Sequence, residues 1–555
     1  MIIDFIYVII NIIIYDISEV LMDLTNFSLI YPDEKSLKAH YAGIDRPYIS
    51  MFELEELGLT DILELRGVDL SEFFTTDKTV MEYRMEVFED MLSNEDISKT
   101  LSRLIPVLND IMELRRLEAD SGDTASYLSS ITEIELYISS IDLLYKGFAE
   151  ASVPVKSKAF VTLAAHIKEL VESDYYRELN KKLNELTNRV REIKSVTIGV
   201  NLDAQLRPAE AGVLSINSES FKSGDVLEKI LRLNFKEDEY TCIANLVPFG
   251  KKQSENQKTA LALAFNSAIN DVYKSSLRSW KKIVQNYVLE NTDFLLALIP
   301  EIEFLSKGTA LLRQLREKGC TLSRPEIIDD GSIVYEATEL YNPCVALKID
   351  SDIVSNDMIF DNSARIYVLT GPNRGGKSVI TCATGIALAM MQLGMFVPAA
   401  KAKMSPADAI MTHFPTGAED TIEKGRLGEE CARLEDIFGR VTEKSLVLLD
   451  ESLSSTGSFE ASYIAAEVLR GLSMSGCRCI FSTHLHELAS EIDNINKQSL
   501  EAGGSPIDTL VAGIEEGQRS FKIHRAKPDG KSYARDIAQK YGLTYENIVT
   551  KLESR

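Results

Sequence analysis

The sequence has few features of a secreted or zinc-stabilised protein. Its 555 residues contain only seven cysteines, an odd number, and no two of them form a C-x-x-C pair. Because disulfide frameworks and structural zinc sites rely on paired cysteines, the sequence predicts neither. Cys477 and Cys479 could share one face of a strand, and we interpret them as residues of a buried strand. This cysteine content is typical of a reduced, cytoplasmic protein.

Basic residues and long apolar runs are also scarce. Lys and Arg number 60 against 84 Asp and Glu, so the net charge of −24 argues against coating nucleic acid through bulk charge, although it leaves room for a local basic site. The apolar start Met1–Tyr15 is shorter than the roughly 20 residues of a membrane-spanning helix and contains Asp4 and Asn11. It lacks the basic start of a signal peptide, so we expect no membrane anchor. Two interpretations of residues 1–21 stay open: a structured extension, or a true start at Met22.

The spacing of apolar residues divides the chain into helical and mixed parts. Residues 60–194 and 258–325 carry apolar side chains at three- and four-residue spacing, which predicts long helices. Between them, runs such as Ser195–Leu202 predict strands of a small β-containing insert over 195–257. Beyond 326, short apolar runs alternate with helices, as in an α/β domain with a largely parallel sheet. The predicted fold class is a multidomain chain with an elongated, mainly helical body, this insert, and an α/β domain.

The sharpest motif is GPNRGGKS at residues 371–378, which fits the phosphate-loop pattern G-x-x-x-x-G-K-[ST]. Arg365–Thr370 before it is predicted as a strand and residues 377–393 as a helix, which is the required context. Glycines let backbone N–H groups turn toward phosphate oxygens, and a helix N-terminus adds partial positive charge. We expect Lys377 to reach the β- and γ-phosphates of ATP and Ser378 to ligate Mg²⁺. The predicted nucleotide-binding residues are Gly371, Pro372, Asn373, Arg374, Gly375, Gly376, Lys377 and Ser378.

Two further apolar strands end in residues that suit nucleotide hydrolysis. The run LVLL leads into Asp450 and Glu451, at the strand end where a nucleotide site needs acids. We expect Asp450 to hold Mg²⁺, directly or through water, and Glu451 to polarise the attacking water. The run IFST ends at His484, which could contact the γ-phosphate. His486 follows, and we interpret this H-x-H as positional because no third metal ligand is evident.

Together these motifs resemble the MutS family of DNA mismatch-repair ATPases. The resemblance is continuous over about 340–545, and it includes GPNRGGKS at 371–378, GMFVPA at 394–399, LVLLDES at 446–452, STHLHEL at 482–488 and GKSYARDIAQKYGL at 530–543. Lys377 and Ser378 match the family's phosphate-loop positions, Asp450 its Mg²⁺-site acid, Glu451 its catalytic acid, His484 its switch histidine and Asn373 its loop asparagine. The resemblance implies ATP and Mg²⁺ as cofactors and a homodimer with composite ATP sites.

The resemblance also implies a domain order. It assigns residues 1–59 to an N-terminal segment of unclear fold, 60–194 to a helical core, 195–257 to a clamp-like insert that contacts DNA, 258–325 to returning lever helices, 326–515 to the ATPase domain and 516–555 to a helical dimerisation module. Residues 1–59 are too few for the family's mismatch-recognition module, and we interpret Met51–Glu55 as an amphipathic surface helix rather than its Phe-x-Glu wedge. We also expect no C-terminal Smr-type nuclease.

Some positions depart from the family pattern. Arg374 stands where Met is common, and Leu453–Thr456 replaces a glycine-rich run after the acidic pair. The family's trans-acting Ser-Thr pair aligns with Gly425 and Arg426, so we hypothesise that Arg426 or Ser455 reaches the γ-phosphate of the partner's site.

A basic stretch is the candidate surface for nucleic acid. It surrounds Trp280 and consists of Lys251, Lys252, Lys274, Arg278, Lys281 and Lys282. Contact with a phosphate backbone would be salt-dependent and sequence-neutral, although a solvated helix face is the alternative interpretation. The sequence thus predicts an ATP-dependent clamp on structured or branched DNA, with low sequence specificity. The alternative is a mechanical ATPase with a non-DNA client such as the ribosome or a protein complex.

Overall fold

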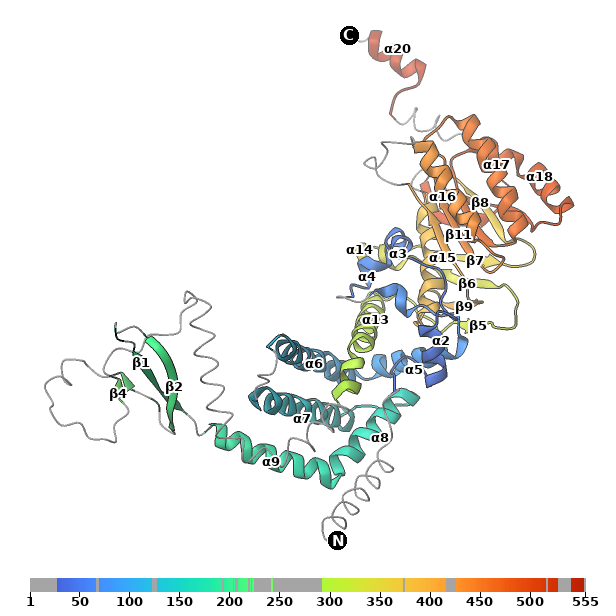
Figure 1. Ribbon diagram of the computed structural model, residues 1–555. Helices are drawn as coiled ribbons and strands as arrows, with labels where there is room; N and C mark the ends of the chain where they lie inside the picture. Colours follow the sequence, from blue (N-terminus) through green and yellow to red (C-terminus); the bar gives the residue numbers. More distant parts are fainter. Residues whose placement is uncertain are drawn as a thin grey trace, which may run out of the picture. The chain divides into compact units, whose positions relative to one another are not determined.

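The computed structural model divides the chain into two compact units (Figure 1). The residues that the structure describes are 27–65, 69–121, 127–191, 194–202, 204, 208–217, 220, 222–223, 241–242, 292–372, 375–415, 426–515, 518–527 and 541–553. Among them, the first unit draws on residues 99–152 and 162–299, and the second on 27–98, 153–161 and 300–553.

The first unit contains long helices and two pairs of strands. Its helices are α7 (Tyr127–Ala149), α9 (Asp174–Arg191) and most of α6 (Glu95–Ser121) and α8 (Lys158–Glu172). The buried Tyr176 of α9 donates its hydroxyl to Asp142 of α7 over 2.9 Å, which ties these two helices together. Its strands are β1 (Ser195–Leu202), paired antiparallel with β2 (Pro208–Asn217), and β3 (Lys222–Ser223), paired parallel with β4 (Thr241–Cys242). The strand predicted at 195–202 is therefore confirmed, while the basic cluster at 251–282 lies outside the described residues.

The second unit is organised around a six-stranded sheet in the order β10-β11-β12-β8-β13-β14. The strands are β8 (Ile366–Thr370), β10 (Ile410–His413), β11 (Leu446–Asp450), β12 (Arg478–Ser482), β13 (Ile507–Glu515) and β14 (Gln518–Arg525). The first five run parallel and β14 runs antiparallel to β13. The predicted parallel α/β sheet is confirmed, and it continues through β14, past the boundary expected at residue 515.

Helices cover both faces of this sheet, which explains why its central strands are apolar throughout. They are α15 (Lys377–Gln392), α16 (Arg426–Arg440), α17 (Ser458–Ser475) and α18 (His486–Glu501). Val447 and Leu449 of β11 belong to one apolar core with residues of α16, α17 and α18. Leu448 points to the opposite face, where its side chain lies against Gly385 of α15. Cys477 and Cys479 are fully buried at β12, as predicted.

A smaller sheet packs against the other side of α15. Its order is β5-β9-β6-β7, with β5 (Glu326–Ile327), β6 (Tyr335–Leu340), β7 (Asn356–Phe360) and β9 (Lys401–Met404). Buried and exposed residues alternate along β7, so one face is buried and the other faces solvent. Tyr335 of β6 is buried and donates its hydroxyl to the Thr384 carbonyl of α15 over 3.0 Å, which fixes the two against each other. The short helix α14 (Pro343–Lys348) follows β6.

The segment before the helical part packs on this unit. Its elements are α2 (Glu34–Tyr41), α3 (Met51–Leu57), α4 (Leu59–Ile62) and the 3₁₀ helix η1 (Leu70–Phe73), followed by α5 (Lys78–Ser93), and α13 (Ile299–Glu317) returns later in the chain. Tyr48 forms a parallel bridge with Ala409 next to β10, and its N–H donates to the Asp408 carbonyl over 2.7 Å. Ser50 and Glu53 form a capping box that begins α3, which confirms a helix at Met51–Glu55.

The prediction of a helix-rich, multidomain chain with mixed α/β sheets is thus confirmed in outline. Among the helices that the structure describes, none is both long and apolar enough to cross a membrane.

Candidate nucleotide site

Three neighbouring strands of the large sheet bring the predicted site residues to one edge. In the parallel register, Asp450 of β11 lies beside Ser482 of β12, and Ser482 lies beside Leu369 of β8. The carboxyl ends of these strands therefore meet, as the sequence predicts for a nucleotide site. The phosphate loop follows β8, the acidic pair ends β11, and His484 follows β12.

The backbone of the phosphate loop requires glycine at defined positions. Gly371 has a φ of 140° and Gly376 a φ of 93°, a region that other L-residues rarely adopt. A Cβ atom on Gly371 would lie 2.7 Å from the Ala512 side chain, and one on Gly375 would lie 2.8 Å from the Pro372 carbonyl oxygen. Gly376 is the N-cap of α15, so the unpaired N–H groups of the first helical turn lie at the loop. The predicted Asn373 and Arg374 lie outside the described residues.

Lys377 places a buried ammonium group within this loop. Its Nζ donates to the carbonyl oxygens of Gly371 and Pro372, each over 3.2 Å, and lies 3.5 Å from Nδ1 of His484. Burial lowers the pKa of Lys377, while Glu451 and Asp450 act in the opposite direction. A buried cation beside the start of a helix, whose first N–H groups are free, is suited to bind phosphate oxygens.

Glu451 and His484 form a direct pair across β11 and β12. Nε2 of His484 lies 2.6 Å from Oε1 of Glu451, and both side chains are partly exposed. Glu451 has a φ of 49°, and its N–H donates to the Ser482 carbonyl over 2.8 Å. The carboxylate therefore lies at the sheet edge beside the phosphate loop, where it could orient a water molecule.

The donor atoms near Lys377 fit a magnesium ion. Asp450 is buried, and its Oδ1 has no hydrogen-bond partner among the described residues. Ser378, in the first turn of α15, has an exposed side chain. Carboxylate and hydroxyl oxygens are hard donors, and Mg²⁺ in such sites uses one or two protein ligands together with substrate phosphates. The described residues hold no group of three or more His, Cys, Asp and Glu that could bind a metal ion.

Family comparisons match most of the chain. A model described as MutS domain V matches residues 367–543, and a model described as the MutS2 N-terminal domain matches residues 76–318. The chain belongs to the MutS family. All the predicted site residues fall within the match to MutS domain V, which is the family's ATPase domain.

Individual relatives agree with this assignment. The chain is 26% identical over 528 residues to DNA mismatch repair protein MutS of Thermotoga neapolitana, which covers 86% of the chain and 59% of the relative. It is 23% identical over 510 residues to DNA mismatch repair protein spellchecker 1 of Drosophila melanogaster, covering 81% and 52%. It is 37% identical over 240 residues to MutS of Lachnoclostridium phytofermentans, covering 41% and 24%. At its longest matches, the chain thus spans little more than half of the MutS relatives.

The positions that depart from the MutS pattern are only partly described. Arg426 begins α16 and Ser455 lies in the loop after β11, and both side chains are exposed. Their roles in trans stay predictions. Gly425 lies outside the described residues, as does most of the MutS-like stretch 530–543.

Sequence reasoning missed two buried residues of this MutS domain V. His413 ends β10, and its Nδ1 lies 2.7 Å from Oγ of Ser452, the residue after Glu451. A signal was present, because His413 ends an apolar strand of the same sheet just as the acidic pair does.

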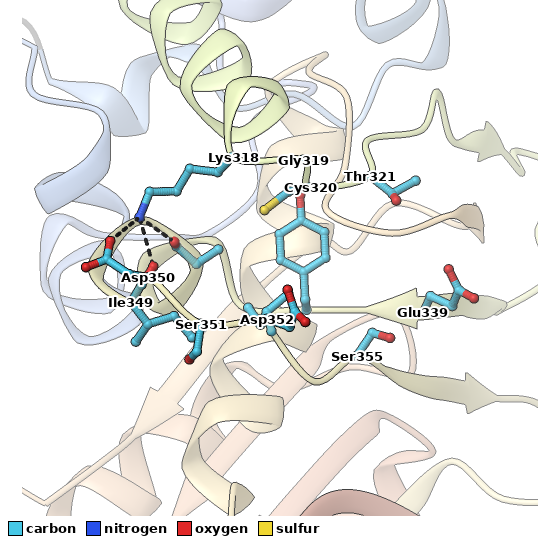
Figure 2. A pocket seen from close by; sticks show the side chains of 13 residues that line it. Lys318, Gly319, Cys320, Thr321, Glu339, Ile349, Asp350, Ser351, Asp352 and Ser355 are labelled. Atoms are coloured by element: carbon cyan, nitrogen blue, oxygen red, sulfur yellow. Dashed lines mark hydrogen bonds and ion pairs between the residues drawn. The ribbon is translucent and has the colours of Figure 1, made fainter.

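A separate cavity of about 460 Å³ lies at the end of α13 and shares no residue with the predicted ATP site (Figure 2). Lys318 at its wall points to the end of α14, where Nζ donates to the carbonyl oxygens of Leu347 and Ile349, each over 2.9 Å. Asp350 and Asp352 make the rest of the wall acidic. Lys318 therefore caps α14 at its C-terminal end, where a cation is favourable.

Proposed function

We propose that this MutS-family chain binds ATP with Mg²⁺, hydrolyses it, and uses the cycle to switch a homodimer that binds structured or branched DNA. The observation that carries the proposal is the contact chain Lys377–His484–Glu451 at the phosphate loop. It links the group suited to hold phosphate with the group suited to activate water. The match to MutS domain V supports the same reading.

Each residue has a physical task in this mechanism. Lys377 offsets the charge of the phosphates in a buried setting, and the start of α15 supplies N–H donors. Asp450 and Ser378 would hold Mg²⁺, which when bound neutralises phosphate charge. Glu451 accepts a proton from the attacking water, which makes the oxygen a better nucleophile.

His484 can report the presence of the terminal phosphate. Lys377 Nζ can only donate, so Nδ1 of His484 accepts and Nε2 carries the proton that it donates to Glu451. A phosphate that draws Lys377 away would release Nδ1 and change how His484 holds Glu451.

DNA is the proposed client because the relatives bear the name of DNA mismatch repair proteins. The test is the ATPase rate of the purified chain against duplex DNA, four-way and three-way junctions, and ribosomes, at two salt concentrations. We expect stimulation by branched DNA that weakens as salt rises. Equal rates with every nucleic acid, or stimulation by ribosomes alone, would remove DNA from the proposal.

The dimer is tested separately. We expect ATP to favour a homodimer, and hydrolysis to depend on protein concentration because each site is completed by the partner. Analytical ultracentrifugation with and without ATP measures the first expectation. If Arg426→Ala leaves the concentration-dependent rate unchanged, its role in trans is wrong.

A further inference from the structure

The loop that carries Glu451 has an unusual backbone on both sides of Ser452. Glu451 has a φ of 49° and Leu453 a φ of 64°, values that cost energy for any residue with a side chain. In the MutS pattern a glycine-rich run follows the acidic pair, but in this chain the corresponding residues are Leu453–Thr456. Other contacts must therefore hold this conformation in place of glycine's freedom.

Ser452 provides one such contact through its buried side chain. Only 5% of Ser452 and 2% of His413 is exposed. Oγ of Ser452 lies 2.7 Å from Nδ1 of His413 and 3.2 Å from the carbonyl oxygen of the same residue. Leu453, the next residue, is buried in the apolar core, so the loop is fixed by a polar contact and an apolar one in succession.

The proton positions at His413 follow from its other nitrogen. Nε2 lies 3.2 Å from the backbone carbonyl oxygen of Glu430 in α16, and a carbonyl oxygen can only accept. Nε2 therefore carries the proton, which leaves Nδ1 as an acceptor in the neutral ring. The single hydroxyl proton of Ser452 is then directed to Nδ1, and the hydrogen-bond chain runs Ser452 to His413 to α16.

The loop is thus fastened on two sides. On one side the N–H of Glu451 donates to Ser482 of β12. On the other side Ser452 is held by His413 of β10. Because these anchors are on adjacent residues of the loop, they fix the peptide between them and with it the direction of the Glu451 side chain, whose carboxylate reaches His484.

We propose that Ser452 and His413 are positioning residues that hold the Glu451 carboxylate in its hydrolytic orientation. The proposal rests on the proposed ATPase function. Neither residue contacts the phosphate loop in the described structure; both act through the loop backbone. Loss of the contact should therefore slow hydrolysis and spare nucleotide binding.

The test compares Ser452→Ala with Ser454→Ala, a matched substitution at an exposed position of the same loop. Single-turnover hydrolysis and the Kd for Mg²⁺-ATP are measured in the full chain. We expect Ser452→Ala to slow hydrolysis by about tenfold to a hundredfold, because small misplacements of a reacting group have effects of this size. The Kd should stay within about twofold, and Ser454→Ala should match wild type, since the Ser454 side chain is exposed.

Conservative variants separate positioning from stability. Ser452→Thr keeps the hydroxyl and should recover hydrolysis to within about threefold of wild type, whereas Ser452→Cys replaces a strong donor by a weak one and should fall with the alanine variant. If Ser452→Ala does not fold, Ser452→Cys provides a second test of the same hydrogen bond. In a Glu451→Gln background, Ser452→Ala should cause no further loss, because both substitutions remove the same function.

Two results distinguish this inference from the proposed function. If wild type shows no Mg²⁺-dependent hydrolysis, the proposed function is wrong. If wild type hydrolyses ATP and Glu451→Gln does not, yet Ser452→Ala and Ser452→Cys both turn over at the wild-type rate, positioning by Ser452 is wrong. Positioning by Ser452 would also be wrong if both variants lost affinity for Mg²⁺-ATP by the same factor as they lost hydrolysis rate.

Discussion

His484 and Glu451 form a hydrogen bond of 2.6 Å between Nε2 and Oε1, and the same imidazole lies 3.5 Å from the ammonium of Lys377. One side chain therefore touches both the predicted water-activating acid and the predicted phosphate-binding cation. Because the three residues are in contact, their effects on nucleotide binding and hydrolysis should be coupled, and single substitutions test the role of each.

Lys377→Ala should weaken ATP binding. The substitution removes a buried cation that we propose binds phosphate, and charge-assisted contacts of this kind are worth about 1.5–3 kcal/mol, or roughly tenfold to a hundredfold in Kd. Equilibrium titration with a fluorescent ATP analogue measures the change. Lys318→Ala is the matched control, since that lysine caps α14 beside the separate cavity. An unchanged Kd for Lys377→Ala would contradict the site.

Glu451→Ala should bind ATP and hydrolyse it poorly. General-base catalysis contributes about a hundredfold to ten-thousandfold, so we expect a loss in this range with a near-normal Kd. The trapped ATP should shift the chain toward the dimer in analytical ultracentrifugation. His484→Ala should slow hydrolysis less, because the carboxylate remains. Wild-type turnover by Glu451→Ala would contradict its assigned role.

Gly371→Ala should disrupt the phosphate loop. The new Cβ would lie 2.7 Å from the Ala512 side chain, at a φ of 140° that alanine rarely adopts. We expect a loss of about 1–3 kcal/mol in the free energy of unfolding, together with weaker ATP binding. Gly439→Ala in α16 is the control, because nothing lies within 4 Å of its new Cβ and alanine favours a helix. Urea denaturation should therefore show that the free energy of unfolding falls in Gly371→Ala and rises in Gly439→Ala.

Stability should depend on pH through Glu301 of α13. Its carboxylate accepts hydrogen bonds from Ser28 and from the N–H of Leu29, each at 2.7 Å, and burial raises the pKa of Glu301 to about 7 from 4.5. A raised pKa means that the folded state disfavours the ionised form. The free energy of unfolding should therefore fall as pH rises from about 4.5 to 7.

The matched variant is Glu301→Gln, which resembles the protonated acid. It should remove this decline and be more stable than wild type at pH 8, by up to about 3 kcal/mol for a pKa shift of this size. Urea denaturation at pH 5 and pH 8 measures the difference. Glu336→Gln, at an exposed position of β6, should keep the wild-type profile. A Glu301→Gln profile that still declines would assign the effect to another group.

The sequence was sufficient where chemistry is written in contiguous residues. The phosphate loop, its flanking strand and helix, and the acidic pair follow from local patterns, and the structure places β8 and α15 at the predicted positions. Parallel pairing of β8, β12 and β11 then brings distant motifs to one sheet edge.

Contacts between distant parts of the chain could not be read in the same way. His413 and Ser452 are 39 positions apart and meet only because β10 and β11 are neighbours. The left-handed backbone conformation of Glu451 and Leu453 could not be predicted from the sequence either, since neither residue type favours a positive φ.

The bridge between Tyr48 and Ala409 bears on how the part of the chain that matches MutS domain V can be isolated. Tyr48 accepts from the N–H of Ile410 over 3.0 Å, so residues that precede both family matches protect the outer border of the sheet at β10. Arg440 stacks over the Tyr48 ring at 4.3 Å and adds to this cover. A recombinant piece cut at the start of the family match would uncover that border, and uncovered strand borders recruit other chains. Residues 27–75 should be kept, or supplied as a separate peptide, whenever the part that matches MutS domain V is expressed alone.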